Sequence, residues 1–162
     1  MVISLAAALG ARGASAQTGG CTLTRFSDPP REVLSCADGL SVTAEEAATY
    51  RFIDRARDGR PTGAELSGRG LLVDSPPRRG RFQILTPHAI ASVRGTVWAV
   101  DVSPARTSVF VREGAVGVRR PGGPEVTLRS GDGVDVEAGE GPLAVTRWSA
   151  RRAATLLARF GR

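Results

Sequence analysis

The chain has 162 residues and a formal net charge of +6 at pH 7, and every one of its 22 basic residues is an arginine. That length suits one domain, or one domain with a small N-terminal appendage. The arginines are scattered among 16 acidic residues, and the basic clusters at 78–81, 119–120 and 151–152 contain no interleaved aromatic side chain. The charge pattern therefore excludes nucleic acid as the expected partner.

Residues 1–16 are typical of a secretory signal peptide. An apolar run covers residues 2–9, and Ala14-Ser15-Ala16 has the small-x-small pattern of a cleavage site, although no basic residue precedes the run. The alternative is a buried N-terminal strand or helix. The run is much shorter than the ~20 apolar residues that span a bilayer, and charges or glycines interrupt every later apolar stretch. We therefore expect a periplasmic protein, cleaved near Ala16, without integral membrane insertion.

Two cysteines, Cys21 and Cys36, follow the expected cleavage site. In an oxidising compartment such a pair predicts one disulfide that closes a short loop. A lipidated Cys21 is an alternative, but the three residues before it fit a lipidation signal poorly. A metal site is another, but the only histidine, His88, lies far away in the sequence. The sequence favours the disulfide, and it predicts no bound metal and no cofactor.

Residues 37–80 allow more than one interpretation. Thr43 and Glu46 have the spacing of a capping box that would open a helix through residues 47–48, whereas residues 50–53 would suit a strand. Residues 71–73 indicate a strand. The proline- and arginine-rich residues 75–80 predict an exposed loop between an N-terminal part and a β core.

The segment from Asp54 to Glu65 resembles a calcium-binding loop. Carboxylates stand at its first, fifth and twelfth positions and a glycine stands at its sixth. Ala56, however, occupies a position where calcium needs an oxygen ligand, and arginines within the segment oppose a cation. A polar Asp-Gly turn is the favoured interpretation.

From residue 82 onward, apolar residues alternate with polar ones over short stretches separated by glycine-rich turns, which predicts short antiparallel strands. The fold class expected is mainly β, a sandwich or a barrel- or solenoid-like stack, with a short C-terminal α-helix and a small disulfide-closed N-terminal segment. The alternating positions are 82/84, 89/91/93, 98/100/102, 109/111, 116/118, 126/128, 134/136 and 143/145.

The C-terminal residues change to a helical period. Between Trp148 and Phe160 the apolar side chains share one side of a helix and the arginines share the other. This predicts a short amphipathic helix packed on the β core, with docking on a membrane surface or a partner as the alternative. The expected organisation is thus a signal peptide (1–16), an N-terminal segment (17–65), a β domain (66–147) and the helix (148–162).

Catalytic patterns are missing from the sequence. A Ser-His-Asp arrangement would have to recruit His88, which follows Pro87 in a segment with a structural interpretation. No phosphate-binding glycine loop precedes a helix, and no metal-ligand spacing is present. The chain is therefore expected not to be an enzyme.

The sequence resembles the FecR domain family over residues 66–138. The strongest part of the resemblance is residues 82–100, and residues 70–73, 107–118 and 126–132 match around it. The resemblance rests on a Thr-Pro pair after an aliphatic strand, a Val-Arg-Gly-Thr stretch followed by an aromatic residue, and a later strand that ends at a glycine. The motif residues, to which we assign a structural or binding role, are Thr86, Pro87, Arg94, Gly95, Thr96, Trp98 and Gly114.

This resemblance implies a periplasmic β domain of envelope signalling. Members that regulate iron uptake carry a cytoplasmic anti-sigma segment and a transmembrane helix, and this sequence is expected to lack both and to be a stand-alone module. Its expected partner is another envelope or membrane protein, met through protein–protein contacts. A cell-wall or ligand-binding envelope module without a signalling role is the alternative.

Overall fold

The protein is described by a computed structural model that covers residues 16–18 and 20–162. The predicted signal peptide lies outside these residues, except for Ala16. The strands are β1 (Ala16–Thr18), β2 (Cys21–Ser27), β3 (Pro30–Cys36), β4 (Ser41–Glu45), β5 (Thr49–Ile53), β6 (Gly63–Ser75), β7 (Phe82–Leu85), β8 (Ile90–Val93), β9 (Thr96–Val102), β10 (Arg106–Glu113), β11 (Ala115–Arg119), β12 (Val126–Arg129), β13 (Asp132–Glu137) and β14 (Thr146–Arg147). The helices are the 3-10 turn η1 (Pro77–Arg79) and α1 (Ala150–Ala158).

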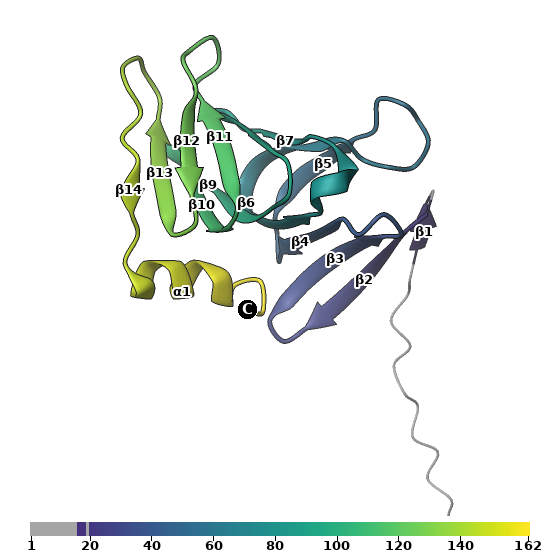
Figure 1. Ribbon diagram of the computed structural model, residues 1–162. Helices are drawn as coiled ribbons and strands as arrows, with labels where there is room; N and C mark the ends of the chain where they lie inside the picture. The colour runs from purple at the N-terminus through teal and green to yellow at the C-terminus, as the bar shows by residue number, and fades with distance from the viewer. Residues whose placement is uncertain (1–15, 19) are drawn as a thin grey trace, which may run out of the picture.

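The strands form a curled sheet with the shape of a half-barrel (Figure 1). One half, sheet A, has the order β1-β2-β3-β4-β6-β9-β10-β13-β14, and the other half, sheet B, has the order β5-β6-β7-β8-β11-β12. Strand β6 belongs to both halves. The predicted mainly β fold with short strands and a C-terminal helix is confirmed.

One pair of strands departs from the predicted antiparallel pattern, because β6 and β7 run parallel. Strand β6 pairs with β5 and β7 over its first half and with β4 and β9 over its second half. The chain then returns from Ser75 to Phe82, beside the start of β6, through the short segment that holds η1. That short return is possible because β6 curls, and Arg69 has a positive φ of 66° at the bend.

The main core lies between the two halves of the sheet. Its largest fully buried side chains include Trp98, Phe82, Leu66 and Ile84, which come from both halves. The alternation predicted for the β core places these residues inward, because successive side chains of a strand point to opposite faces. Burial of this apolar face is the main force that holds the curl.

A second, smaller core lies where α1 packs on sheet A. Leu156 and Phe160, with Trp148 just before the helix, contact Leu72 and Phe110. The helix begins after Ser149, whose side chain accepts a hydrogen bond from the backbone N–H of Arg152. The predicted amphipathic helix is therefore present and packs on the β core. Within residues 16–18 and 20–162, no helix has the length and the apolar character needed to cross a bilayer.

The N-terminal strands extend sheet A as a hairpin of β2 and β3 (Figure 1). Cys21 and Cys36 face each other across this hairpin and form a disulfide, with their Cα atoms 3.9 Å apart. The predicted disulfide is confirmed. It fastens the hairpin at the end where the chain turns from β3 into β4.

Two sequence interpretations are wrong. Thr43 and Glu46 do not open a helix: Thr43 is buried in strand β4, and Glu46 lies in the turn that follows. A capping box is a local signal, and here the pairing of β4 with β3 and β6 outweighs it. The alternating pair Leu143 and Val145 lies in an extended loop before β14, where Val145 is exposed, because β13 has already provided the last core strand.

Candidate interaction site

Thr86 is the centre of the turn that joins β7 to β8. Its hydroxyl oxygen lies 2.9 Å from both the backbone N–H and the carbonyl of Ala89, and 2.8 Å from the hydroxyl of Thr107. The backbone N–H of Thr86 also donates to the carbonyl of Ala89. Pro87 suits this turn because its ring fixes φ and it lacks an N–H. Thr86 therefore ties the turn to strand β10.

His88, the only histidine, belongs to the same turn. Its Nδ1 lies 3.1 Å from the hydroxyl of Thr107, which is fully buried. Within the described residues, the side-chain groups at hydrogen-bond distance from His88 are the hydroxyls of Thr86 and Thr107. The arrangement is a structural hydrogen-bond cluster and does not resemble a base oriented by a carboxylate.

A second cluster of motif residues lies at the opposite end of β8. Gly95 has a φ of +69°, and a Cβ there would lie 2.9 Å from a ring carbon of Pro77. Gly114 approaches so closely that a Cβ would lie 2.7 Å from the carbonyl oxygen of Gly95. Thr96 donates to the carbonyl of Ala115 at 2.9 Å. Positions 95 and 114 need glycine because a Cβ would clash there and because the backbone has a positive φ.

The remaining motif residues have different environments. Trp98 is fully buried in the main core. Arg94 is exposed, and its side chain is not among the ion pairs and hydrogen bonds of the described residues. The structure thus gathers most of the motif residues into two clusters, one around Thr86 and one around Gly95, and does not bring the two clusters together into one site.

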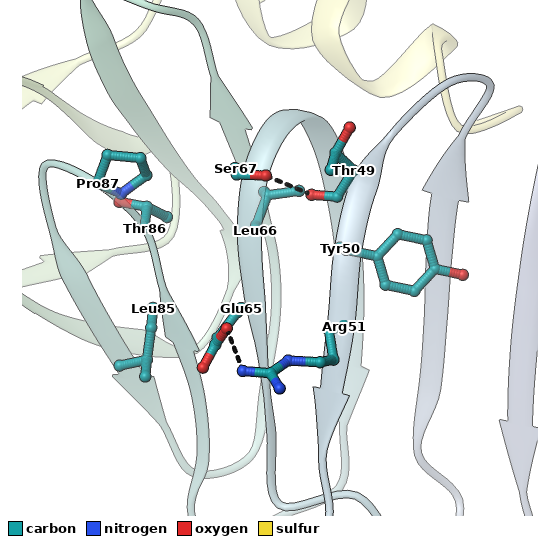
Figure 2. A pocket seen from close by; sticks show the side chains of 9 residues that line it. All are labelled: Thr49, Tyr50, Arg51, Glu65, Leu66, Ser67, Leu85, Thr86 and Pro87. Carbon is teal, nitrogen blue, oxygen red and sulfur yellow. Dashed lines mark hydrogen bonds and ion pairs between the residues drawn. The ribbon is translucent and has the colours of Figure 1, made fainter.

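A groove of about 410 Å³ lies on the outside of sheet B, and Figure 2 shows the side chains that line it. It opens where β6 and β7 stop pairing, after the Glu65–Leu85 pair. An ion pair of 2.7 Å between Arg51 and Glu65 lies in it, and Thr86 and Pro87 form its far edge. The paired charges leave the groove without an unpaired ionic group, so it offers little to fix a charged ligand.

Tyr50, which also borders this groove, points away from it toward the β2–β3 hairpin. Its hydroxyl donates to Glu32 at 3.1 Å. Burial, with the nearby negative charge of Glu32, raises the pKa of Tyr50 to about 12. The contact joins strand β5 of sheet B to strand β3 of sheet A.

Helix α1 is held on sheet A by two ionic contacts. Arg159 donates to the carboxylates of Asp101, at 2.7 Å, and of the buried Glu45. Hydrogen bonds to Asp101 and Glu45 raise the pKa of Arg159 above its usual value. Because this guanidinium satisfies a buried carboxylate, the contact orients the end of the helix.

The second contact lies in the first turn of the helix. Asp135 accepts hydrogen bonds of 2.6 Å from Arg152 and from the hydroxyl of Ser108. Burial acts to raise the pKa of Asp135, but the hydrogen bonds from Arg152 and Ser108 outweigh it, so the pKa lies below its usual value. The guanidinium of Arg152 also lies over the ring of Trp148, 3.6 Å from its centroid.

The calcium-like segment is a polar loop between β5 and β6. Asp54 accepts a hydrogen bond from the backbone N–H of Gly59, and Asp58 accepts one from the backbone N–H of Arg60. Glu65 pairs with Arg51 instead. Within residues 16–18 and 20–162 no three His, Cys, Asp or Glu residues gather as a metal site would need.

Exposed arginines gather at one end of sheet B, which we call the basic end. Its loops are 54–62, 76–81 and 94–95, and strand register brings them together: Ile53 pairs with Gly63, Gly63 with Gln83, and Phe82 with Val93. Its exposed arginines are Arg55, Arg57, Arg60, Arg78, Arg81 and Arg94. Sequence reasoning missed this surface because its arginines are scattered along the chain; the loop assigned to residues 75–80 is the signal that pointed to part of it.

Comparison with known proteins gives a family and a fold. The model of the FecR protein family matches residues 29–117, which run from the residue before β3 into β11. This match begins earlier than the resemblance in the sequence motifs, which starts at residue 66, and it ends before residues 126–132. No curated protein matches the chain.

Two crystal structures of a candidate anti-sigma factor from Parabacteroides distasonis ATCC 8503 have a similar fold. Their TM-scores are 0.61 and 0.60, at 18% and 17% sequence identity. The alignment covers 90% of this chain and 64% of each of those chains. The chain therefore spans about two thirds of their length, and the likeness extends beyond the family match to most of the half-barrel.

Proposed function

Because this chain belongs to the FecR protein family, whose model matches more than half of it, we propose that it is a non-enzymatic regulatory domain of the cell envelope. It acts in signalling through contacts with another envelope or membrane protein. The family match is the observation that carries this proposal. The similar fold of the candidate anti-sigma factor supports a regulatory role.

The use of the motif residues supports contact rather than catalysis. Thr86 and His88 are engaged with Thr107 and with backbone groups, and Gly95 and Gly114 are selected by close backbone approach. Polar groups that already have structural partners are poorly placed to bind and activate a substrate. The surface of the domain is then the part that meets a partner.

A periplasmic location is part of the proposal. The Cys21–Cys36 disulfide is consistent with an oxidising compartment, where such bonds persist. The signal-like residues 1–16 supply the route of export. Alkaline phosphatase fused after Arg162 should be active in cells, because the enzyme needs export, and inactive when residues 2–16 are deleted.

Deletion of the gene from its native cells tests the function. We expect a discrete set of transcripts to change, and the complete chain to restore them when supplied on a plasmid. A chain without residues 2–16 should not restore them, because it would remain outside the envelope. Transcripts that stay unchanged, together with co-sedimentation of the protein with purified cell-wall sacculi at high salt, would point to a wall-binding module and contradict the proposal.

A further inference from the structure

We propose that the basic end is the docking surface for an acidic protein segment, and that a cavity between Arg55 and Arg81 receives one of its carboxylate side chains. This inference rests on the proposed function, because it names the surface and the chemistry of the partner that regulation requires.

The three loops of the basic end form one continuous surface. Arg79 holds them together, because its nearly buried guanidinium donates to Asp38 at 2.7 Å and to the carbonyl of Pro61 at 2.6 Å. Gly95 in turn packs against Pro77. The side chains that anchor the loops are thus distinct from those that are exposed on them.

The positive charge of this surface is largely uncompensated. The exposed arginines named above have no carboxylate within 4.0 Å in the described part of the chain. The carboxylates of loop 54–62, Asp54 and Asp58, each accept a hydrogen bond through one oxygen from a backbone N–H of their own loop. Asp38 is engaged with Arg79. Guanidinium groups without internal partners are free to pair with an external anion.

The cavity gives this surface a specific receptor. It has a volume of about 320 Å³, and Arg55 and Arg81 line it together with the apolar atoms of Ile53 and Ala56. The polar groups of Thr62 and Gln83 in its wall already have partners, the carbonyl of Ile53 and the hydroxyl of Ser92. The two guanidinium groups are the charged donors that line the cavity, and a carboxylate on a short apolar stem matches both the charge and the walls.

An acidic protein segment fits this surface better than an anionic membrane. Surfaces that dock on lipid usually insert large apolar side chains. Within the described residues the exposed large hydrophobic side chains are Phe26 and Val145, and both lie outside the basic end. The planar guanidinium matches a carboxylate or a phosphate in a bidentate pair, so the apolar anchor is what distinguishes the two partners. Charge without an apolar anchor favours a protein partner.

The test measures binding of a fluorescein-labelled hexaglutamate peptide to the full chain by fluorescence anisotropy, with a hexaglutamine peptide as the uncharged probe. Replacing Arg55 and Arg81 by glutamine (R55Q/R81Q) should weaken hexaglutamate binding about tenfold or more, because both ion pairs are lost. The matched control R106Q/R151Q removes the same charge from exposed arginines outside the basic end, and it should change affinity by less than about twofold.

The outcomes separate the alternatives. Equal loss of affinity in R55Q/R81Q and R106Q/R151Q would mean binding by net charge alone and would overturn the inference. Binding to phosphatidylglycerol vesicles that depends on Arg55 and Arg81, without binding to hexaglutamate, would assign the surface to a membrane and also overturn it. If the chain regulates transcription but R55Q/R81Q binds hexaglutamate as the wild type does, the docking surface fails and the proposed function stands.

Discussion

At the scale of single residues, Thr86 shows how one side chain serves the fold. Its hydroxyl contacts two backbone groups of Ala89 and the hydroxyl of Thr107, and so it couples a turn of sheet B to strand β10 of sheet A. Each such hydrogen bond contributes modestly when made, but a buried partner left without one is costly. The Thr-Pro pair of the motif thus has a physical reason that does not involve a ligand.

Replacing Thr86 by valine should lower the free energy of unfolding by about 1–3 kcal/mol, because the shape is kept while the hydroxyl is lost and the Thr107 hydroxyl loses a partner. Urea denaturation followed by tryptophan fluorescence measures the change. Thr86→Ser is the control, since it keeps the hydroxyl, and it should lose less than Thr86→Val. Equal stability of Thr86→Val and the wild type would contradict the role assigned to this hydroxyl.

Tyr50 provides a second residue-scale prediction, and it is the only tyrosine of the chain. Burial and the charge of Glu32 raise its pKa to about 12, whereas the unfolded chain should titrate near the usual value of about 10. The unfolded state therefore ionises first, and stability falls as the pH rises from about 10. Absorbance titration of the folded protein should give the higher midpoint, and Glu32→Gln should bring that midpoint part of the way down. A midpoint near 10 in the folded protein would contradict the Tyr50–Glu32 contact.

At the scale of elements, α1 is held on sheet A by apolar packing and by two separate ionic contacts. Phe110 and Trp148 stack with centroids 5.1 Å apart, and Arg159 and Arg152 each reach a carboxylate of the sheet. Burial of the apolar face drives docking of the helix on the sheet, and the arginines set its position there. The two contributions have different responses to mutation and to pH.

Arg159→Gln should destabilise the protein by about 2–3 kcal/mol, because the buried Glu45 carboxylate would keep Arg69, at 4.0 Å, as its remaining cation. The expected loss of stability is at the lower end of the range for buried pairs, because a third of the Arg159 side chain is exposed to solvent. Arg151→Gln, on the exposed face of the same helix, should stay within about 0.5 kcal/mol of the wild type. Denaturation of both variants in urea measures the difference, and equal stabilities would contradict the orienting role of Arg159.

The contact between Asp135 and Arg152 should make stability depend on acid pH. Because hydrogen bonds lower the pKa of Asp135 in the folded state, its contribution is present above the unfolded value of about 3.9 and is lost as the pH falls through the folded value. Asp135→Asn should therefore be less stable than the wild type at pH 7, and the difference should shrink below about pH 4. A difference that stays constant from pH 7 down to pH 2 would contradict the charge-assisted contact.

The elements differ in how well the sequence predicts them. The valine-rich strands from Phe82 to Glu137 and the C-terminal helix are predictable, because their periodicity reports which face is buried. Strand β4 is not, because it is buried on both faces and so lacks alternation. Tertiary pairing decides such segments, and a local signal such as the capping box at Thr43 is overruled.

The candidate sites were predictable only in part. The Thr-Pro and Arg-Gly-Thr positions stand out in the sequence, yet their arrangement in two clusters depends on how β8 places its two ends. Arg159 and Glu45 are 114 positions apart, and only the fold brings them together. The cavity between Arg55 and Arg81 likewise arises from the parallel return of β7 beside β6.

At the scale of the whole molecule, the half-barrel separates maintenance of the fold from contact with a partner. Most motif residues lie near the two ends of β8 and hold the curled sheet together, and the helix packs on sheet A (Figure 1). The basic end presents exposed arginines. The proposed regulatory role needs a stable frame and an accessible surface. The distribution of buried and exposed polar groups in this chain provides both.

The most direct test of this account is complementation of the deletion strain, with transcripts and periplasmic protein levels measured together. His88→Ala, which removes the only histidine, and R106Q/R151Q should restore the transcripts, whereas R55Q/R81Q should accumulate normally and fail to restore them. Failure of His88→Ala at normal protein level would indicate chemistry at that turn. Full restoration by R55Q/R81Q would show that regulation does not pass through the basic end.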